Sequence, residues 1–502
     1  MTIQGALLNA LSSLAAEQAQ AQIIANNIAN ASTPGYVRRD LPRSENMAGR
    51  EGNGVALGVT QRAGDSLLEI VARSANGDKA YGTRMTDILG ALTRIAGQPS
   101  DPRSLSSMLG KFQAAMTSLS STPADAVTQT QAISAASGLV DTFHILDRAV
   151  SDARINADLG VAQDVDAVNT ALDELARVER DYARAAARGE STAEFEDRRA
   201  TLIDSIAANV PVRVFGNGPG QLILRTDQGT TLLDTGTVHR LTFTHSALIP
   251  ASGPSGGLSA VMVDGAVLRS TQTGSIAAGL QLRDKELPQY GDMLDQMAAN
   301  LATGFQTADP IARVAAVDGS GAKLAGLFTR VGATNVGAPS FVVVNLADPA
   351  TYNGFARTLA LNPKVDPNQP GNEPRRIRDG ANDDATPGNA SDNSIILAAL
   401  NAMDQNQAYG TSTGLPGQLT IANAAAQSLG RIQSDNSGWL VRADTRTRLA
   451  TQAGQDLSNK TGVNVDEEMQ RLLLVQQTYS ASAQVIQAAA KMLDTLNTLN
   501  AR

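Results

Sequence analysis

The sequence predicts a multidomain α+β fold with terminal coiled-coil helices, a helical bundle core and inserted, mainly β domains. Three observations support this prediction. Apolar stripes with coiled-coil spacing occupy both ends of the chain, and charged segments with helical periodicity lie between the two stripes. Short β-type runs separated by Gly, Asn and Asp interrupt the middle. At 502 residues the chain is long enough for several domains.

Composition excludes several classes of protein. The formal net charge of -8 argues against a general nucleic-acid binder or a coat for anionic lipid, because both need a basic surface. The chain has no cysteine, so disulfides, thiolate metal sites and a cysteine nucleophile are not available. No apolar run reaches the roughly 18 residues of a membrane span, and the first residues lack the pattern of a cleavable secretory signal. If the chain leaves the cell, another route is expected to carry it.

The N-terminal stripe follows the alternating four-three spacing of a coiled-coil seam. Its positions are Ile3, Leu7, Ala10, Leu14, Glu17, Ala21, Ile24 and Ile28. Glu17 is the one charged residue in this stripe. Asn26, Asn27 and Asn30 add amides that can fix the register between helices. An ordinary core helix is the alternative interpretation of the same pattern.

This helix ends at a clear signal. Asn30 tolerates the left-handed conformation that often follows a helix, and Pro34 disfavours helical geometry at the residue before it. A type II turn is predicted next, formed by Thr33, Pro34, Gly35 and Tyr36. The basic pair Arg38 and Arg39 follows, and such a pair by itself is usually a solvated surface.

The C-terminal helix has an equally clear start. Asn464 can cap it, and the acidic residues 466–468 lie where the helix dipole favours negative charge. Its predicted seam holds Met469, Leu472, Gln476, Tyr479, Ala483, Ile486, Ala490 and Leu493. We expect the two terminal stripes to pair with each other. Two helices alone would still expose apolar and amide surface, which further copies of the chain could bury.

Between its ends the chain is expected to alternate between helical and β regions. The predicted domains are residues 1–40 with 464–502, a terminal coiled-coil domain; 41–210 with 280–310 and 420–463, a helical core; 211–279, an inserted β domain; and 311–419, a second, less regular insert.

Local patterns support this division. A helical stripe from Val161 to Tyr182 lies in the core region, and Ser191 with Glu194 has the spacing of a capping box for the next helix. In the second insert, "FVVV" at 341–344 predicts a strand. Residues 395–403 predict a short helix, and the Pro-, Gly- and Asn-rich stretch 362–393 predicts a long loop.

No catalytic, cofactor or metal site is predicted. The sequence has three histidines, His144, His239 and His245. None of them has the spacing of zinc ligands. Asp379, Asp383 and Asp384 could bind calcium but lack the EF-hand pattern, so a solvated loop is the preferred interpretation. The glycines of "FGNGPG" at 215–220 fit a β-turn better than a dinucleotide-binding loop.

Both ends of the sequence resemble the axial proteins of the bacterial flagellum, the family of rod, hook and hook-associated proteins. The resemblance is carried by "NNIAN" at 26–30, by "STPGYVRR" at 32–39 and by the segment from Gly462 onward. Blocks at 195–215 and 279–306 are also similar to segments of this family. Within it, the sequence is most similar to the proteins of the hook–filament junction.

The sequence departs from the family pattern at two places. Ser12-Ser13-Leu14 stands where the family usually has Ser-Gly-Leu, and Ser482 stands where an Asn is common. Neither change removes a helix-forming residue, so only local contacts are affected.

The resemblance implies a structural adaptor rather than an enzyme, with no cofactor, no nucleic-acid partner and no membrane insertion. It implies an extracellular protein of the flagellum, exported unfolded by the flagellar type III route without a cleaved signal peptide. The implied partners are the hook protein, hook-associated protein 3, an export chaperone on the C-terminal helix, and other copies of this chain. A ring of roughly eleven subunits is implied by the family, because symmetry alone does not set that count.

The terminal residues are expected to carry subunit assembly, with helices that stay mobile in the monomer and bury one another in the polymer. The expected assembly residues are Ile3, Leu7, Leu14, Ile24, Asn26, Asn27, Ile28, Asn30, Met469, Leu472, Gln476, Tyr479, Ile486 and Leu493.

Two alternative functions stay open at this point. A rod or hook protein is disfavoured by residues 36–39 and by the pair Gln476 and Gln477. A secreted enzyme or an adhesin would carry its activity on the central inserts.

Overall fold

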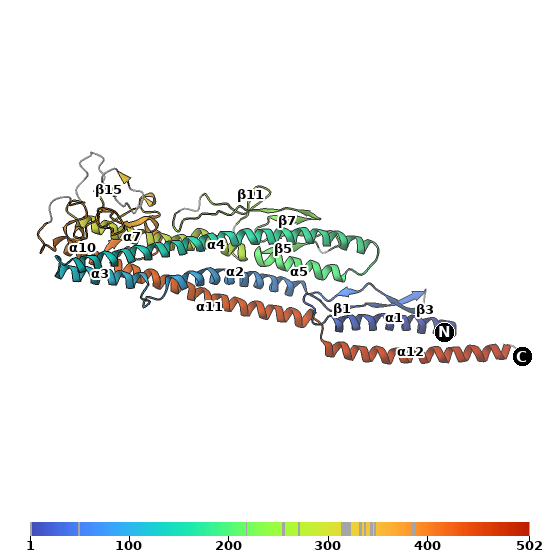
Figure 1. Ribbon diagram of the computed structural model, residues 1–502. Helices are drawn as coiled ribbons and strands as arrows, with labels where there is room; N and C mark the ends of the chain where they lie inside the picture. Colours follow the sequence, from blue (N-terminus) through green and yellow to red (C-terminus); the bar gives the residue numbers. More distant parts are fainter. Residues whose placement is uncertain are drawn as a thin grey trace.

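The computed structural model describes residues 3–48, 51–216, 218–253, 257–269, 272–312, 323–330, 334–335, 338–341, 345, 348–383 and 388–500. The molecule is elongated, and both termini lie at the same end of it (Figure 1). Helices α1 (Ile3–Ala29) and α12 (Val465–Asn500) form that end, and a long helical bundle with small sheets forms the rest. This architecture confirms the predicted α+β fold class.

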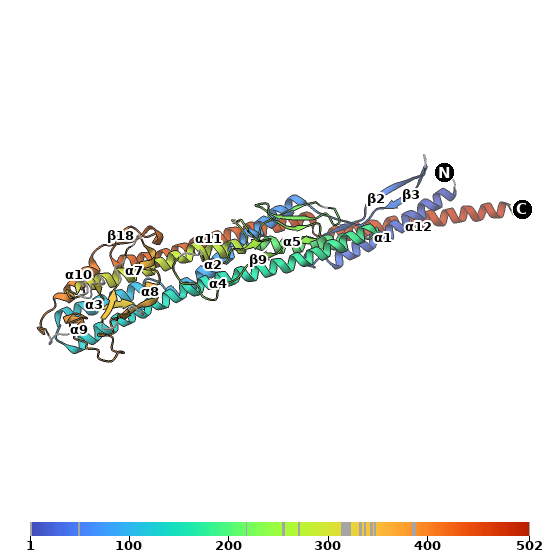
Figure 2. The same ribbon diagram turned by 90° about the horizontal axis from the view of Figure 1, so that it is seen from above.

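The bundle is built from helices that differ greatly in length. Its members are α2 (Ser66–Ala96), α3 (Leu105–Ser121), α4 (Ala126–Ala187), α5 (Ala193–Asn209), α6 (Ser275–Gln281), the π-helical turn η1 (Leu282–Glu286), α7 (Leu287–Ala308) and α11 (Ile421–Thr461). With 62 residues, α4 is about 93 Å long. It runs along most of the bundle, while α2 and α11 pack side by side against each other (Figures 1 and 2).

Two features of these helices differ from the sequence prediction. The stripe from Val161 to Tyr182 is only the second half of α4, which starts at the Asp125 cap. The predicted capping box at Ser191 and Glu194 is wrong, because the N-cap of α5 is Thr192 and its side chain caps no backbone N–H. Thr192 has helical backbone geometry, and its hydroxyl contacts the Glu196 carboxylate at 2.9 Å instead.

Two small antiparallel sheets follow α5. The first has the order β5-β6-β7-β8 and the second the order β11-β10-β9. Their strands are β5 (Val212–Phe215), β6 (Ile223–Thr226), β7 (Thr231–Asp234), β8 (Thr237–Val238), β9 (Leu241–Thr242), β10 (Met262–Val263) and β11 (Ala266–Val267). Leu224, Leu232 and Leu233 are buried with Val168 and Leu172 of α4, so these strands cover the second half of that helix.

The end of the bundle far from the termini carries short elements. They are β12 (Lys323–Leu324), β13 (Phe328–Arg330), β14 (Thr334–Asn335), β15 (Ala338–Phe341), η2 (Pro349–Thr351), α8 (Phe355–Thr358), β16 (Leu359–Leu361), α9 (Arg376–Asp379), α10 (Ser394–Asp404), β17 (Gln407–Ala408), η3 (Thr411–Thr413) and β18 (Gln418–Leu419). The predicted short helix lies within α10, and Phe341 ends β15, whereas 342–344 lie outside the described residues.

Within the stretch 362–393, residues 362–383 are more ordered than a solvated loop. Asp379 is almost fully buried, and its carboxylate pairs with Arg378 at 2.6 Å and with Arg375 at 3.1 Å. Burial by itself raises the pKa of Asp379, but the two arginines outweigh it and lower the pKa below its usual value. The prediction of a solvated Asp379 is therefore wrong, because neighbouring arginines in the same stretch neutralise it. Asp384 lies outside the described residues.

Another difference from the prediction lies directly after α1. The prediction assigned the chain from residue 41 to the helical core, but strands β1 (Arg39–Asp40), β2 (Arg43–Ala48), β3 (Glu51–Leu57) and β4 (Gln61–Arg62) occupy this region. β2 and β3 form an antiparallel hairpin, and β1 pairs with β4. Pro42 and the glycines of 52–58 disfavour helix here.

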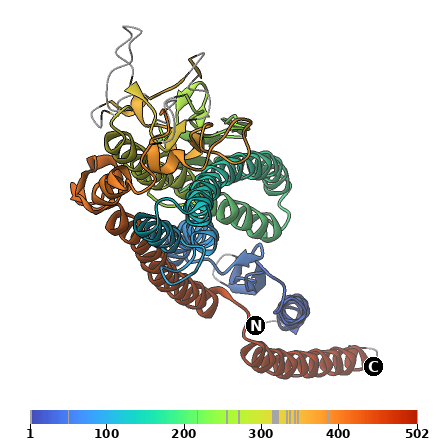
Figure 3. The same ribbon diagram turned by 60° about the vertical axis from the view of Figure 1, so that its left-hand side comes forward.

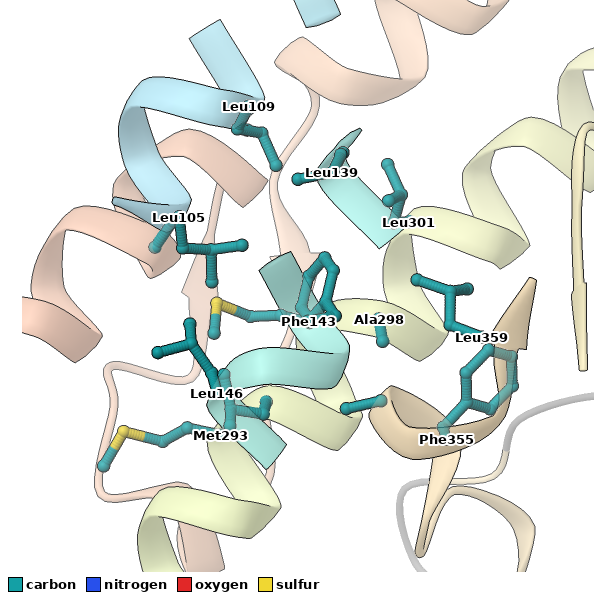
Figure 4. Close-up of a cluster of buried hydrophobic side chains, with 14 of the residues drawn as sticks. Leu105, Leu109, Leu139, Phe143, Leu146, Met293, Ala298, Leu301, Phe355 and Leu359 are labelled. Atoms are coloured by element: carbon teal, nitrogen blue, oxygen red, sulfur yellow. The ribbon is translucent and has the colours of Figure 1, made fainter. Parts of the chain in front are cut away.

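The core far from the termini is a dense cluster of aliphatic and aromatic side chains contributed by several helices. Phe305 of α7 lies 5.5 Å from Phe112 of α3 and 5.1 Å from Phe328 of β13, measured between ring centroids. Nearby, Leu105 and Leu109 of α3 converge with side chains of α4, α7 and α8 (Figure 4). This packing ties the short elements to the long helices.

One carboxyl group is fully enclosed in this region. The Asp295 side chain of α7 accepts hydrogen bonds from the Gly354 N–H at 2.6 Å and the Ala356 N–H at 2.7 Å, and it contacts the Ser252 hydroxyl. Burial raises the pKa of Asp295 to about 7, although these hydrogen bonds act in the opposite direction. The Ser252 hydroxyl can donate to the ionised carboxylate or accept from the protonated acid.

Asp295 should therefore make stability depend on pH. Between about pH 4, where Asp ionises in the unfolded chain, and about pH 7, the folded state holds a proton that the unfolded state has lost. The free energy of unfolding should fall by about 1 kcal/mol per pH unit as pH rises through this window, and then level off. Urea unfolding of the parent and of Asp295→Asn at pH 5, 6, 7 and 8 measures this. Parallel pH profiles for the two proteins would contradict the prediction.

Candidate assembly site at the joined termini

Helices α1 and α12 lie side by side and run in opposite directions, apart from the bundle (Figures 1 and 3). We call them the terminal helix pair. The α1 stripe is covered by α12 and by neighbouring strands, because all its described members are buried or half-buried: Leu7, Ala10, Leu14, Glu17, Ala21, Ile24 and Ile28. Ile3 belongs to α1, but its side chain lies outside the described residues.

The hairpin of β2 and β3 covers a second face of α1. Glu17 is only 4% exposed, and its carboxylate pairs with Arg43 of β2 at 2.8 Å. The Val55 N–H of β3 donates to the Ser12 hydroxyl at 3.1 Å. Glu17 therefore does not interrupt the stripe as a solvated charge would; it attaches the hairpin to the helix.

Half of the residues predicted for the α12 seam lie at or beside the interface. The other half of the seam is displaced by one residue toward the N-terminus. The buried and half-buried positions that repeat every seven residues are Glu468, Val475, Ser482 and Ala489. The prediction instead chose Met469, Gln476, Ala483 and Ala490, of which only Ala483 is half-buried. Glu468 and Ser482 are polar, so apolar periodicity alone favoured the neighbouring set.

The other half of the predicted seam lies at the border of the interface. Leu472 and Ile486 are half-buried, whereas Tyr479 and Leu493 are just over one-third exposed. Ser482 contacts Ser13 of α1, with 3.2 Å between the two hydroxyl oxygens. These serines belong to the two places where the sequence departs from the family pattern, and the fold brings them together.

The amide of Asn27 is the most fully bonded polar group of this site. Its Nδ2 donates to the Arg39 carbonyl at 2.9 Å and to the Glu468 carboxylate at 3.1 Å. Its Oδ1 accepts from the Tyr36 hydroxyl at 2.9 Å and from the Arg39 N–H at 3.0 Å. Asn27 is 1% exposed, and it joins α1, the turn after it and the start of α12.

The other two asparagines act differently. The Asn30 amide donates to the Asn26 carbonyl at 2.9 Å, and Thr33 contacts the Asn30 side chain at 3.3 Å. Asn30 thus satisfies the end of its own helix. The side chain of Asn26 is exposed. Of the three amides, Asn27 is the one that bonds across to α12.

The turn after α1 rests on the bundle. The Tyr36 N–H donates to the Thr33 carbonyl at 3.1 Å, and Gly35 has a φ of +80°, as the third position of a type II turn requires. A Cβ at Gly35 would lie 2.8 Å from the Thr201 hydroxyl of α5. Burial raises the pKa of Tyr36, and the charge of Arg39 offsets part of this effect.

The basic pair after the turn is not a solvated surface, so that expectation is wrong. Arg38 pairs with Glu467 of α12 at 3.6 Å, and its backbone N–H donates to the Thr461 carbonyl at the end of α11. Arg39 stacks on the Tyr36 ring at 4.8 Å from its centroid. Arg38 and Arg39 are each about four-fifths buried because the start of α12 and the turn close around them.

The start of α12 is fixed as the sequence predicted. The Asn464 side chain accepts from the Asp466 N–H at 3.0 Å and from the Glu467 N–H at 3.4 Å. Arg471 pairs with Glu467 at 2.8 Å and with Glu468 at 3.4 Å. The acidic first turn therefore caps the helix and also supplies Glu468 to Asn27.

Sequence reasoning missed four residues that contribute to this site through their charges or their backbone. They are Glu17, Arg39, Arg43 and Glu468. The available signal was a charged residue within or beside an apolar seam at each end, since a buried charge requires a partner.

The outer side of α12 remains uncovered. Several large apolar side chains of α12 are exposed by at least one-third: Val465, Met469, Leu473, Leu474, Tyr479, Val485, Met492 and Leu493. Leu474, Val485 and Met492 among them share the outer side of the helix. α12 thus has apolar side chains facing away from α1 as well as toward it.

Within the described ranges, no group of three or more His, Asp or Glu side chains is arranged to hold a metal ion. No helix of the same ranges combines the length and the apolar character that crossing a membrane requires.

Three family models match different parts of the chain. Residues 89–309 match the helical domain of flagellar hook-associated protein FlgK. Residues 7–36 match the flagella basal body rod protein model, and residues 457–499 match the C-terminal model of the flagellar basal body rod FlgEFG proteins. The two rod models thus cover much of the terminal helix pair.

Relatives that align with almost the whole chain share one name. The chain is 24% identical over 552 aligned residues to "Flagellar hook-associated protein 1" of Salmonella typhimurium, covering 97% of this chain and 98% of the relative. The Escherichia coli protein of that name is 25% identical, with the same coverage. The structure of the flagellar hook junction protein FlgK from Burkholderia pseudomallei is similar in fold, with a TM-score of 0.57 and 11% identity, over 77% of this chain and 98% of that one.

Replacing Asn27 by Ala should loosen the terminal helix pair. The substitution removes the Asn27 partner of the Tyr36 hydroxyl and of the Arg39 backbone, and it leaves the buried Glu468 carboxylate with Arg471 as its charged partner. We expect the opening free energy of α1 to fall by about 2 kcal/mol, so that its amides exchange hydrogen about 30-fold faster. Asn26→Ala, one residue earlier on the exposed side, should leave the exchange rate nearly unchanged. Equal rates in the two variants would disprove the role of Asn27.

Replacing Gly35 by Ala should lower the free energy of unfolding by more than a strained φ alone would. The new Cβ would meet the Thr201 hydroxyl, so the turn would have to move away from α5. Gly189→Ala is the matched control, because Gly189 has a φ of +71° and no atom within 4 Å of the new Cβ. We expect losses in the free energy of unfolding of about 2 kcal/mol for Gly35→Ala and about 1 kcal/mol for the control. Equal losses would mean that the turn does not press on α5.

Proposed function

This chain belongs to the flagellar hook-associated protein 1 family, and we propose that it joins hook to filament by packing its terminal helices against those of neighbouring copies. Proteins of this family are structural parts of the extracellular flagellum. Membership also implies assembly with other flagellar components. The proposal adds how copies of the chain pack against one another.

The observation that carries the proposal is the uncovered face of α12. Leu474 is 61% exposed and Met492 is 56% exposed, and Val485 lies on the same side of the helix. A soluble monomer rarely leaves so many large apolar side chains open along one helix. Fully burying one such side chain contributes about 1.5–3 kcal/mol, so a neighbour that covered three of them would gain several kcal/mol.

The two terminal helices would contribute unequally to such contacts. α1 is covered by α12 on one face and by the β2–β3 hairpin on another, so Leu8 and Leu11 are its main exposed apolar side chains. The neighbouring copy would therefore gain most of its apolar contact from α12. Among the residues named from sequence as assembly residues, we assign Met469, Tyr479 and Leu493 to contacts between copies.

Most of the remaining assembly residues would act within the copy. Seven of them hold or shape the terminal helix pair in our proposal: Leu7, Leu14, Ile24, Asn27, Ile28, Leu472 and Ile486. Asn30 ends α1, while the exposed Asn26 and Gln476 are available for polar contacts to a neighbour.

The proposal includes the partners that the family implies. These are the hook protein on one side, hook-associated protein 3 on the other, an export chaperone that holds α12 before assembly, and a closed ring of copies. The uncovered apolar face of α12 is a surface that a chaperone would need to protect before export. We further propose that the protein is exported without a cleaved signal peptide and acts without catalysis.

The double substitution Leu474→Gln with Val485→Gln tests the proposal. Both side chains are exposed, and Gln is compatible with helix, so the monomer should keep its stability. We expect cells carrying this variant to lose filaments and swimming, because the neighbour loses several kcal/mol of apolar contact. Swimming assays and electron microscopy of the flagella provide the measurement.

Leu248→Gln is the matched control, because Leu248 is 74% exposed but lies in a loop of the body of the molecule. It should leave filaments and swimming unchanged. Normal filaments in the double variant, at normal protein level, would overturn the assembly mechanism.

A further inference from the structure

A loop of the first insert lies along the bundle like a strap. It comprises residues 246–253, in the connection from β9 to β10, and we call it the strap. The Ser246 N–H donates to the Asp158 carboxylate of α4 at 2.7 Å. The Arg154 side chain, one turn earlier on α4, donates to the Pro250 carbonyl. The first half of the strap therefore follows one face of α4.

The second half of the strap rests on α7. Ala251 is 2% exposed, and a Cβ at position 291 would overlap its carbonyl group, so Gly291 allows the strap to lie on the backbone of the helix. One turn further along α7, the Asp295 carboxyl contacts the Ser252 hydroxyl. The strap thus spans the two helices and ends at a buried acid.

The same acid holds a part of the second insert. Residues 352–358 form a turn that leads into α8, and we call them the α8 segment. The two Asp295 oxygens accept from the N–H groups of Gly354 and Ala356, at 2.6 and 2.7 Å. The Gly354 N–H also lies 3.3 Å from the Ser252 hydroxyl. Asp295 is therefore the point at which α7, the strap and the α8 segment meet.

The surroundings of Asp295 favour its neutral form. The charged and titratable groups near it come from four elements, and they are His144, Asp147, Arg148 and Arg154 of α4, Asp292 of α7, Arg330 of β13 and Arg357 of α8. Burial raises the pKa of Asp295 to about 7, and the charge of Asp147 acts in the same direction.

The nearest cation is used elsewhere. The Arg330 guanidinium donates to the Thr351 and Asn353 carbonyls at 3.3 and 3.2 Å. Its charge attracts that of Asp295, but among the described residues no Arg, Lys or His forms an ion pair with Asp295. An ionised Asp295 would therefore be a buried charge with hydrogen bonds but without a counter-ion in contact.

We propose that the strap and the α8 segment form one latch, which a neutral Asp295 closes and an ionised Asp295 loosens. The neutral carboxyl can donate to the Ser252 oxygen while it accepts from the two N–H groups. Opening the latch would give the ionised carboxylate access to water, which relieves the cost of burying its charge. Because both segments bind the same group, they should open together. This inference does not depend on the proposed assembly.

Hydrogen exchange of the full-length protein at pH 6 and pH 8, followed by mass spectrometry, tests the inference. Asp295 should lose its proton near pH 7 in the closed latch and near pH 4 once it is exposed. After correction for the intrinsic pH dependence of exchange, the protection of the strap and of the α8 segment should each fall about tenfold from pH 6 to pH 8. Strands β6 and β7 of the same insert should keep their protection. Constant protection in either latch segment would overturn the inference.

Asp295→Asn removes the titrating group with little change of shape. Its amide nitrogen faces a backbone N–H in place of one acceptor oxygen, so both segments should be less protected than in the parent. Their protection should no longer depend on pH, so the ratio between pH 6 and pH 8 should be close to one. A ratio that stays near ten in this variant would overturn the inference.

The double substitution His144→Gln with His245→Gln is the matched control, because histidine is the side chain that most often changes charge in this pH range. The His144 ring contacts the Leu359 carbonyl at 2.8 Å, next to the α8 segment, and His245 is exposed beside the strap. The tenfold ratio should persist without these two rings. Its disappearance would assign the response to histidine and refute the role of Asp295.

Ser252→Ala covers the case in which Asp295→Asn loses its helical circular-dichroism signal. It removes the side-chain contact between the strap and Asp295 but leaves both N–H groups of the α8 segment on the carboxyl. The strap should then be less protected at pH 6 and lose most of its pH response, while the α8 segment keeps its own. Parental protection and pH response of the strap in this variant would also overturn the inference.

Discussion

The buried amide of Asn27 is the interaction on which the terminal part of this molecule depends. An Asn side chain has two donors and two acceptor positions, and all four are used here, by Tyr36, Arg39 and Glu468. Since an unpaired amide in such a place would cost free energy, the site stabilises one arrangement of helix, turn and second helix. The abrupt end of α1 serves this arrangement: the turn returns Tyr36 and Arg39 to the helix they have just left.

Charge pairs extend this arrangement outward in three directions. Glu17 with Arg43 attaches the hairpin to α1, and Arg38 with Glu467 attaches the start of α12. Asp197 connects Arg39 to the bundle. Because apolar contact is not directional, it can hold two helices together without fixing their register or angle. In this chain the polar contacts define the geometry, and the apolar seam supplies most of the burial.

This division also explains why one helix is covered and the other is open. α1 uses its apolar and polar faces within the chain, whereas α12 touches α1 along one side only. A family of extracellular flagellar proteins that assemble with one another has a use for such an open helix. The same surface would be a liability in a free protein, since exposed apolar patches promote association.

The sequence by itself determined the fold class, the two terminal stripes, the cap at Asn464 and the end of α1, because each depends on local spacing or on the conformational limits of single residues. It also indicated the family. It could not place Glu468 rather than Met469 in the seam, nor recognise Arg38 and Arg39 as buried. Glu468 depends on Asn27 and Arg38 depends on Glu467, partners more than 400 residues away along the chain, and Arg39 depends on Asp197 of α5. Only the tertiary structure brought these charges together, because a pattern of apolar periodicity carries no information about which polar groups meet.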